Sequence, residues 1–379
     1  MYIHERKQWP HFTWDKALID KQLLEVRHLQ GRLLGRLEAL GLPVCEEATF
    51  QSLTQDVLKT SEIEGETLDI QQVRSSLARK LGIKISKSVK VDRSVNGVVA
   101  MMLDATQNYA HPLTQERLFG WHASLFPKGK SGTVKAGRWR GKSSGAMQVV
   151  SGAYGHEKIH YEAPTYDRLA SEMKIFFKWI QALPEQALPE QALPEMDRVL
   201  QAALAHFWFV TIHPFEDGNG RMARAIADSL LARSEKSSQR FYSMSSQIQA
   251  ERKEYYDVLE RCQKGSLDIT LWMEWFLNCL KRAMQQSENM LATVLGKSRF
   301  WKAHAGESFN DRQRSLLNRL LDGFEGKLTS SKWAKLAKCS QDTALRDIAC
   351  LLERKILIKE DAGGRNTHYQ LVRPQMVSS

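Results

Sequence analysis

A stretch of twelve residues, 213–224, combines side chains that can act on phosphate groups. Its sequence, HPFEDGNGRMAR, holds a histidine, two acids, a Gly-Asn-Gly turn and two arginines. A histidine can accept a proton from a hydroxyl group, and arginines bind phosphate oxygens through paired hydrogen bonds. A carboxylate beside phosphates is a typical ligand of Mg²⁺. The stretch therefore indicates chemistry on a phosphate-containing substrate.

The neighbouring segments predict how this stretch is positioned. The apolar run RVLQAALAHFWFVTI predicts a helix, and Pro214 places His213 on the turn after it, because a residue before proline disfavours helical geometry. The glycines of DGNG can adopt positive φ, and RMARAIADSLLA predicts a second helix. Unpaired N–H groups at a helix N-terminus attract anions. We therefore predict an anion site at the start of the second helix.

Two alternatives compete with this interpretation. DGNG could be an ordinary turn between helices, with Asp217 as a cap and the arginines in solvent. The combination of base, metal ligand, anion site and paired arginines in one loop favours the functional interpretation. A P-loop is excluded, because Ser124 and Ala136 stand where the GKS sequences at Gly129 and Gly141 require a glycine.

The stretch matches every fixed position of the Fic signature, His-x-Phe-x-Asp/Glu-Gly-Asn-Gly-Arg-x-x-Arg. The chain therefore resembles the Fic family, with the catalytic core at residues 95–285. This resemblance implies an all-α fold with a small β-hairpin. It also implies a protein adenylyltransferase, which moves AMP from ATP to a Ser, Thr or Tyr hydroxyl of a target protein or of itself, releases pyrophosphate and uses Mg²⁺.

The resemblance implies a role for each functional position of the signature. His213 is expected to be the general base, and Asp217 to bind Mg²⁺. Arg221 would support the phosphates and the loop, and Arg224 would hold the γ-phosphate of ATP. The remaining positions would form the anion hole for the ATP phosphates: Gly218, Asn219 and Gly220.

A β-hairpin is predicted between Gly137 and Pro164, where VV and IHY flank a glycine-rich turn. It resembles the flap of the family, which pairs with a target segment by strand addition. The expected flap residues are Val149, Val150, Ile159, His160 and Tyr161. In ERKEYYDVL, Tyr255 or Tyr256 could line the adenine pocket, and core packing is an equally good interpretation of either.

The segment TSEIEG, residues 60–65, resembles the inhibitory motif of Fic proteins, Ser/Thr-x-x-x-Glu-Asn/Gly. In the family, the glutamate equivalent to Glu64 pairs with the second arginine of the signature, which is Arg224 here. A carboxylate at that position would remove the clamp for the γ-phosphate and repel ATP. We therefore expect the motif, with Glu64 and Gly65, to keep the resting enzyme inhibited.

Composition limits the remaining possibilities. The chain has 379 residues and a formal net charge of +11, which favours anionic partners. Its five cysteines are scattered without Cys-x-x-Cys spacing, so neither a disulfide framework nor a zinc site is predicted. The sequence shows no signal peptide and no run of about 18 uncharged apolar residues. We expect a cytoplasmic protein without a membrane partner.

Leucines at three- and four-residue intervals predict a helix at residues 16–40, and acids in a first turn indicate a second helix at 46–66. The N-terminal segment, residues 1–94, resembles the N-terminal helical domain of a subset of Fic proteins. Residues 181–195 repeat QALPE three times. A proline at every fifth position predicts a surface spacer there, with a binding role as the alternative. A polar stretch at 286–308 predicts a domain boundary.

The last domain, residues 300–373, is predicted to contain three helices and two short strands around a Gly-Gly pair, which resembles a winged helix-turn-helix. Residues 341–354 would be its recognition helix, and Arg365 would lie on the wing. The residues expected to contact DNA are Gln341, Thr343 and Arg346 in the groove and Lys332, Lys335 and Lys338 on phosphates. Protein docking or dimerisation is an equal alternative, because two acids lie in the same helix.

The sequence leaves other functions open. The main alternative is a nucleotide-sensing, DNA-binding transcription regulator, although sensing alone would not need a base at His213. A Fic enzyme could also use another nucleotide, or remove AMP with Glu64 orienting a water. A homodimer is compatible with these features.

Overall fold

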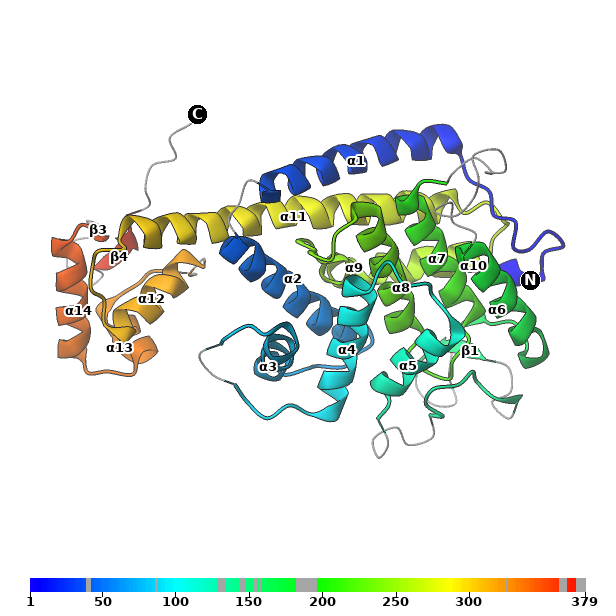
Figure 1. Cartoon of the computed structure of the whole chain (residues 1–379), viewed down its shortest axis with the longest axis horizontal. Coiled ribbons are helices and arrows are strands. Elements are labelled where there is room, and N and C mark those ends of the chain that lie inside the picture. Colours follow the sequence, from blue (N-terminus) through cyan, green and yellow to red (C-terminus); the bar gives the residue numbers. More distant parts are fainter. Residues whose placement is uncertain are drawn as a thin grey trace. The chain divides into compact units, whose positions relative to one another are not determined.

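The computed structural model describes residues 1–38, 42–85, 88–127, 134–142, 147–152, 156, 158–181, 196–322, 324, 326–360 and 367–372. The chain divides into two compact units, Met1–Ser287 and Glu288–Ser379. Most described residues are helical, and the described strands form two-stranded sheets (Figure 1). The expected all-α fold with minor β-structure is confirmed.

Helices α7 (Arg198–Ile212) and α8 (Asn219–Glu235) form the centre of the first unit and pack against each other. Every residue of α7 from Val199 to Ile212 is buried, which is typical of a helix surrounded by other helices. The elements around this centre are η1 (Ile3–Glu5), α1 (Lys16–Glu38), α2 (Leu42–Ile63), α3 (Ile70–Leu81), α4 (Arg93–Gln107), α5 (Gln115–Leu125), β1 (Gln148–Ser151), β2 (Lys158–Glu162), α6 (Tyr166–Gln181), α9 (Met244–Ala250), α10 (Arg252–Gln263) and the part of α11 (Thr270–Ala303) that precedes Glu288.

The N-terminal segment packs onto this centre. Helix α2 packs against α9 and α8. Helix α1 lies along α11 (Figure 1), where Glu25 pairs with Lys281. The ring of Trp9 packs edge-on against Trp208 of α7, with 6.3 Å between centroids. The boundary predicted near residue 94 therefore falls inside one compact unit.

Several element boundaries differ from the expectation. The second helix begins at Leu42 rather than at residue 46, because a proline is tolerated in the first turn of a helix, where its missing N–H would have no partner. That helix ends at Ile63. The polar stretch at 286–308 is helical up to Ala303 as part of α11. All but the first residue of the QALPE repeats lie outside the described residues.

The second unit has its own core. It includes Leu317, Trp333 and Ile348, whose exposed fractions are at most 1%. Strands β3 and β4 pair antiparallel. The number and order of the described elements are those expected for this region: α12 (Asp311–Leu321), α13 (Ser330–Ala337), α14 (Gln341–Glu353), β3 (Leu357–Glu360) and β4 (His368–Leu371).

The side chains expected at DNA lie mostly on the surface of this unit. The exposed ones are Lys332, Lys335, Lys338, Gln341 and Arg346, and Thr343 is half-buried. Asp347 is buried and accepts a hydrogen bond from Arg312 Nε at 3.0 Å, so this acid of α14 does not face solvent. Arg365 and the Gly-Gly pair lie outside the described residues. DNA binding and dimerisation stay predictions.

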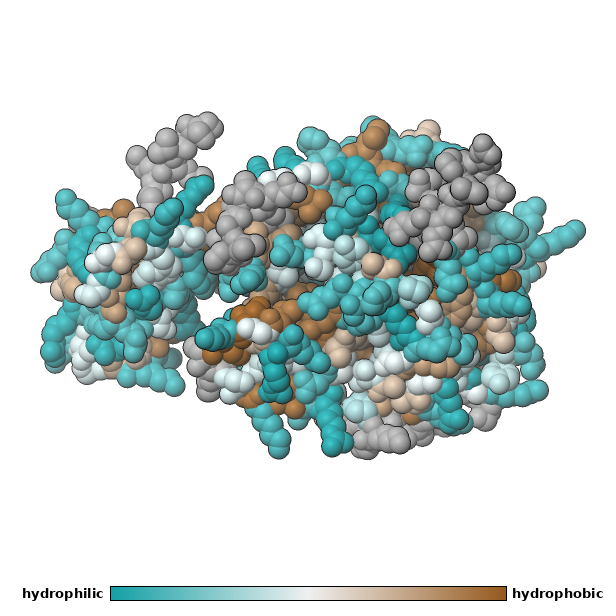
Figure 2. Space-filling model, viewed as in Figure 1, coloured by the Kyte–Doolittle hydropathy of each residue, from teal (hydrophilic) through white to brown (hydrophobic). Residues whose placement is uncertain are grey.

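The face of the molecule in Figure 2 is largely hydrophilic, with hydrophobic residues in small patches. This polar surface fits a chain in which 26% of the residues are charged. Among the described residues, no helix combines the length and the apolar character needed to cross a bilayer.

Candidate active site

His213 lies on the turn that follows α7, as predicted. Its backbone is left-handed, with φ of 52°, and its N–H donates to Phe209 O at 3.0 Å to close the helix. The carbonyl of His213 accepts a hydrogen bond from Arg140 Nε at 2.9 Å. Arg140 is 1% exposed, and its own N–H donates to Pro214 O. No local signal in the sequence points to Arg140, because its partners in this loop, His213 and Pro214, lie more than 70 positions away in the chain.

The ring of His213 is held in the form of a base. Nδ1 lies 3.2 Å from Val210 O. A carbonyl only accepts hydrogen bonds, so Nδ1 carries the proton of the neutral ring and Nε2 keeps a lone pair. Burial lowers the pKa of His213 to about 4, although the hydrogen bond to Val210 opposes this effect. The ring is therefore neutral near pH 7 and able to accept a proton.

Hydrogen bonds between its own residues stabilise the loop after His213. Asn219 is 2% exposed, and its side chain accepts from Phe215 N and donates to Phe215 O, each at 2.9 Å. The Phe215 ring stacks on His122, with 4.1 Å between centroids, and His122 Nε2 lies 3.2 Å from Asp217 O. The Asn219 side chain therefore supports the loop, which leaves the backbone N–H groups of α8 as the expected anion site. His122 was not identified from the sequence.

Asp217 is the open carboxylate of this loop. Its side chain is 55% exposed, and Oδ1 accepts a hydrogen bond from Gly218 N at 2.5 Å. Gly218 precedes α8 with φ of 81°, a conformation that favours glycine. Among the described residues, no group of three or more His, Cys, Asp or Glu side chains gathers to hold a metal. One accessible carboxylate fits Mg²⁺ that completes its shell with phosphate oxygens and water.

The two arginines in the first turns of α8, Arg221 and Arg224, are buried and contact the segment around the end of α2. Arg224 Nη2 lies 2.7 Å from Glu64 Oε1, and Arg224 Nε donates to Thr60 Oγ1 at 2.8 Å. Arg221 Nη1 donates to Glu66 Oε2 at 2.8 Å. The contact between Glu64 and Arg224 has the geometry expected from the inhibitory motif. Glu66 and Thr60 received no role in the sequence analysis, and the paired glutamates of EGE are the only local signal for Glu66.

Glu64 also covers the N-terminus of α8. A Cβ atom added to Gly220 would lie 2.1 Å from Glu64 Oε1, so the carboxylate rests directly against the first turn of the helix. Gly65 follows with φ of 82° and turns the chain away from α2. The carboxylate of Glu64 therefore occupies the place where unpaired N–H groups would attract an anion.

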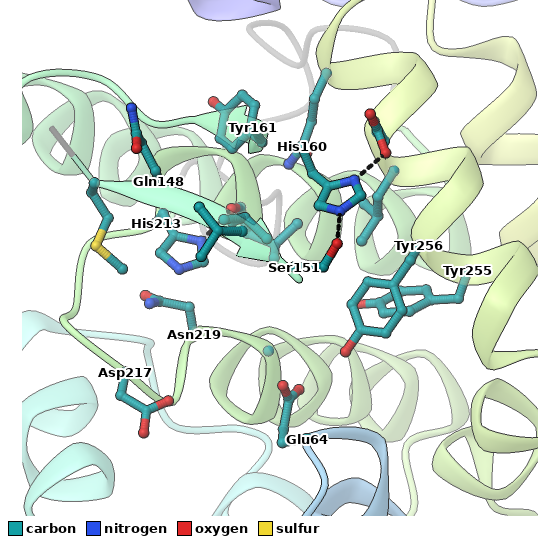
Figure 3. A pocket seen from close by; sticks show the side chains of 18 of the residues that line it. Glu64, Gln148, Ser151, His160, Tyr161, His213, Asp217, Asn219, Tyr255 and Tyr256 are labelled. Carbon is teal, nitrogen blue, oxygen red and sulfur yellow. Dashed lines mark hydrogen bonds and ion pairs between the residues drawn. The ribbon is translucent and has the colours of Figure 1, made fainter. Parts of the chain in front are cut away.

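These groups line one cavity of about 840 Å³ in the first unit (Figure 3). On one side lie Glu64, His213 and residues 216–220, and on the other lie the hairpin β1–β2 and α10. The volume is within the usual range for small-molecule sites. The cavity therefore brings together His213, the Asp217 carboxylate and the N-terminus of α8.

The predicted hairpin is present, and its role as a flap stays a prediction. Val149 pairs with Tyr161 and Val150 with Ile159, with an irregular register between them. Val150 and Ile159 are 48% and 43% exposed, as a target-binding strand requires. Tyr161 differs, because it is 1% exposed and its hydroxyl donates to Thr211 O at 2.7 Å. Tyr161 therefore anchors the hairpin in the core.

The two tyrosines of α10 occupy different environments. Tyr255 is 1% exposed, and its hydroxyl lies 2.9 Å from His206 Nε2. Tyr256 is 36% exposed, and its hydroxyl donates to Ile63 O at 3.3 Å. Both line the cavity. Tyr255 is therefore mainly a core residue, whereas Tyr256 lies beside the inhibitory segment.

Two family descriptions match this chain. Residues 112–231 match the Fic/DOC family, and residues 2–83 match a domain of unknown function, DUF4172. The chain is 29% identical over 242 residues to a protein adenylyltransferase Fic of Culex quinquefasciatus and 24% identical over 274 residues to one of Nematostella vectensis. These alignments cover 63% and 70% of this chain, but 42% and 56% of the relatives. The chain spans about half the length of the curated relatives that it matches.

Solved structures of Fic proteins share the fold. A Fic family protein from Desulfovibrio desulfuricans G20 superposes with a TM-score of 0.54 at 19% identity, covering 97% of this chain and 99% of that one. Fic-1 from C. elegans gives a TM-score of 0.53 at 21% identity, covering 73% and 74%. At these identities the similarity shows the fold alone.

Proposed function

We propose, from the match of residues 112–231 to the Fic/DOC family, that this chain is a protein adenylyltransferase held inactive by its own Glu64. The observation that carries the proposal is the content of one cavity. A neutral histidine with a free lone pair, an open carboxylate and a helix N-terminus face the same space. Curated relatives with the name protein adenylyltransferase support the reaction type.

The proposed reaction uses His213 as the general base. Nε2 of His213 takes the proton of a Ser, Thr or Tyr hydroxyl on a target protein. The hydroxyl oxygen attacks the α-phosphorus of ATP, and the bond to the pyrophosphate leaving group breaks. The N–H groups at the start of α8 hold the phosphates. Mg²⁺ bound through Asp217 would offset the negative charge of the phosphates.

The hairpin is proposed to hold the target. Val150, which lines the cavity, and Ile159, its partner on the other strand, both expose apolar surface. An extended target segment could add to the edge of β1 or β2 through main-chain hydrogen bonds. Such pairing would place its hydroxyl near His213, which increases the rate by fixing the reacting groups relative to each other.

Inhibition is expected because the Glu64 carboxylate and the phosphates of ATP compete for the same position. The Glu64 carboxylate lies against the first turn of α8 and on Arg224, where the phosphates of ATP would bind. Placing two negative groups in one partly buried site costs a large amount of electrostatic free energy. ATP therefore binds in its reactive arrangement only when Glu64 has moved away. The buried Arg224 would then be available to bind the γ-phosphate.

The test measures transfer of α-labelled ATP with Mg²⁺ to proteins of a cell lysate. We expect little label with the parent protein and a clear increase with Glu64→Ala. Glu62→Ala is the matched control, because Glu62 lies two positions away and pairs with Lys59 instead of with α8. It should behave as the parent does.

Adding His213→Ala to the Glu64→Ala protein should lower transfer to the lysate proteins by roughly 10²–10⁴-fold, the usual contribution of a general base. Retained transfer would contradict the role of His213. An absence of transfer from every variant, with other nucleotides also tried, would contradict the enzyme and favour the nucleotide-sensing regulator.

A further inference from the structure

A second hydrogen-bonded group lines the same cavity as His213. Ser151, at the end of β1, places its Oγ 2.5 Å from His160 Nε2. His160, on β2, places its Nδ1 2.5 Å from Glu260 Oε2 of α10. Figure 3 shows these two contacts in line, with Ser151 between His160 and the interior of the cavity. A hydroxyl, an imidazole and a carboxylate in this order form the arrangement that activates serine nucleophiles.

The direction of each hydrogen bond follows from Glu260. Its Oε1 also accepts from Lys264 Nζ at 2.6 Å. Burial acts to raise the pKa of Glu260, but the hydrogen bonds from Lys264 and His160 outweigh it and lower the pKa. The carboxylate is therefore ionised near pH 7 and only accepts hydrogen bonds.

This ionised carboxylate fixes the tautomer of His160. Nδ1 must carry a proton to donate to Glu260, so Nε2 of the neutral ring is an acceptor. The Ser151 hydroxyl then donates its proton toward Nε2. His160 is thus placed to take that proton when Ser151 attacks an electrophile, and Glu260 to stabilise the imidazolium that forms.

A purely structural role does not require this arrangement. The pairing of Ser151 with Lys158 already holds the two strands together at this point, and the contact between His160 and Glu260 alone would attach the hairpin to α10. Ser151 is exposed and adds little packing. Its side chain instead faces a cavity whose other side carries the helix N-terminus expected to hold phosphates.

We propose that Ser151 is a nucleophile activated by His160 and Glu260, and that it accepts the AMP group of the nucleotide bound in this cavity. The assignment of ATP as the donor rests on the function proposed above. Ser151 Oγ forms a bond to the α-phosphorus, the bond from that phosphorus to the pyrophosphate oxygen breaks, and pyrophosphate leaves. The proton of Oγ moves to His160 Nε2. The product is a phosphodiester between Ser151 and AMP.

Self-modification at this position uses a different base from transfer to a target. His213 Nε2 serves an incoming hydroxyl, whereas His160 serves the hydroxyl that the hairpin itself supplies. Modification of Ser151 should therefore depend on His160 and persist when His213 is replaced. AMP on Ser151 would also place a bulky anion beside the exposed strand residues that are proposed to hold a target.

The first experiment maps AMP by mass spectrometry on Glu64→Ala protein that has been incubated with ATP and Mg²⁺. We expect AMP on the peptide that contains Ser151. Ser151→Ala should remove it, and His160→Gln should lower it by roughly 10²-fold or more, as expected for loss of a general base. Adding His213→Ala to the Glu64→Ala protein should leave the AMP on Ser151 unchanged.

A matched pair of variants tests the role of the Glu260 carboxylate. Glu260→Gln should reduce AMP on Ser151, whereas Glu254→Gln, an exposed glutamate on the same helix, should not. Thermal unfolding of each variant shows that it folds.

The second experiment needs no nucleotide. A fluorophosphonate probe forms a covalent bond with activated serines, so the parent protein should acquire it on Ser151, and His160→Gln should not. This adduct supports the nucleophile even if ATP transfers AMP to nothing, which separates the two proposals.

AMP on lysate proteins without AMP on Ser151 would overturn the inference and leave the proposed function intact. An absence of both adducts from Ser151 would overturn it as well, as would modification of Ser151 that is unchanged in His160→Gln.

Discussion

The two sides of the cavity are built in different ways. The loop wall, residues 213–220, is held by buried contacts: Asn219 is 2% exposed and Phe215 is fully buried. The hairpin wall, β1 and β2, is a two-stranded sheet that exposes Val150, Ile159 and Ser151. On this wall, the buried Tyr161 is the anchor to the core.

This difference fits the two tasks proposed for the walls. Phosphates bind to N–H groups that must keep fixed positions, because a misplaced donor loses most of its electrostatic benefit. A partner chain needs exposed main-chain edges and exposed side chains. The loop wall therefore requires internal support, and the hairpin wall requires access.

The largest expected contrast between the walls is in stability. Asn219→Ala leaves the buried N–H and carbonyl of Phe215 without partners. Each such loss costs roughly 1–3 kcal/mol, so the free energy of unfolding should fall by roughly 2–6 kcal/mol. The matched change on the hairpin wall, Ser151→Ala, should cost about 1 kcal/mol or less. Urea unfolding of both variants measures the difference, and equal losses would show that the walls are equally supported.

The next contrast depends on pH. Burial lowers the pKa of His122 and of His213, both behind or on the loop wall, to about 4 from an ordinary value of 6.5. The unfolded chain therefore binds protons between pH 6.5 and 4 that the folded chain does not bind. The stability from these groups is complete above pH 6.5 and is lost progressively as the pH falls from 6.5 to 4. At pH 5 the loss is on the order of 2 kcal/mol for each histidine.

The measurement is urea unfolding of the parent and of His122→Asn at pH 7.5, 6 and 5. The variant should lose less stability on acidification than the parent. Burial and the nearby Asp228 raise the pKa of Asp56 to about 7, so protonation of Asp56 favours the folded state at lower pH. This effect opposes that of the histidines. The contribution of His122 is therefore measured as a difference between the variant and the parent. If the stability of the parent and of the variant changed identically with pH, His122 would be excluded as a source of the stability loss at low pH.

The smallest expected effect lies at the rim of the loop wall. The Glu66 side chain is 49% exposed in its contact with Arg221, whereas the Glu64 side chain is 28% exposed in its contact with Arg224. Exposed ion pairs contribute about 0.2–1 kcal/mol, so Glu66→Ala should raise the affinity for ATP by less than about fivefold. Glu64→Ala should raise it more. Calorimetric titration with ATP and Mg²⁺ ranks the two, and a larger effect of Glu66→Ala would reverse their assigned roles.

Much of the loop wall could be predicted from the sequence. The helix before His213, the turn and the helix after it are local features of consecutive residues, and all three are present. The position of His213 outside α7 follows from Pro214 alone. The second helix begins four residues before the predicted start, because its first turn tolerates the proline at position 43.

Other parts of the site had no local signal. Arg140 and His122 support the loop through contacts with residues 73 and 95 positions away. Tyr161 was assigned to target binding from its place in the hairpin, and the structure shows that it anchors the hairpin instead. Strand periodicity alone could not distinguish these roles, because the side of a strand that faces the core depends on what packs against it.

The sequence by itself determined the chemistry of the loop, because a base, a carboxylate and a helix N-terminus lie within a few consecutive positions. The tertiary structure decided which distant groups meet there. It brings Glu66 to Arg221 across 155 positions and Glu260 to His160 across 100 positions. Such contacts depend on how helices and strands pack, and packing is a property of the whole fold rather than of any short segment.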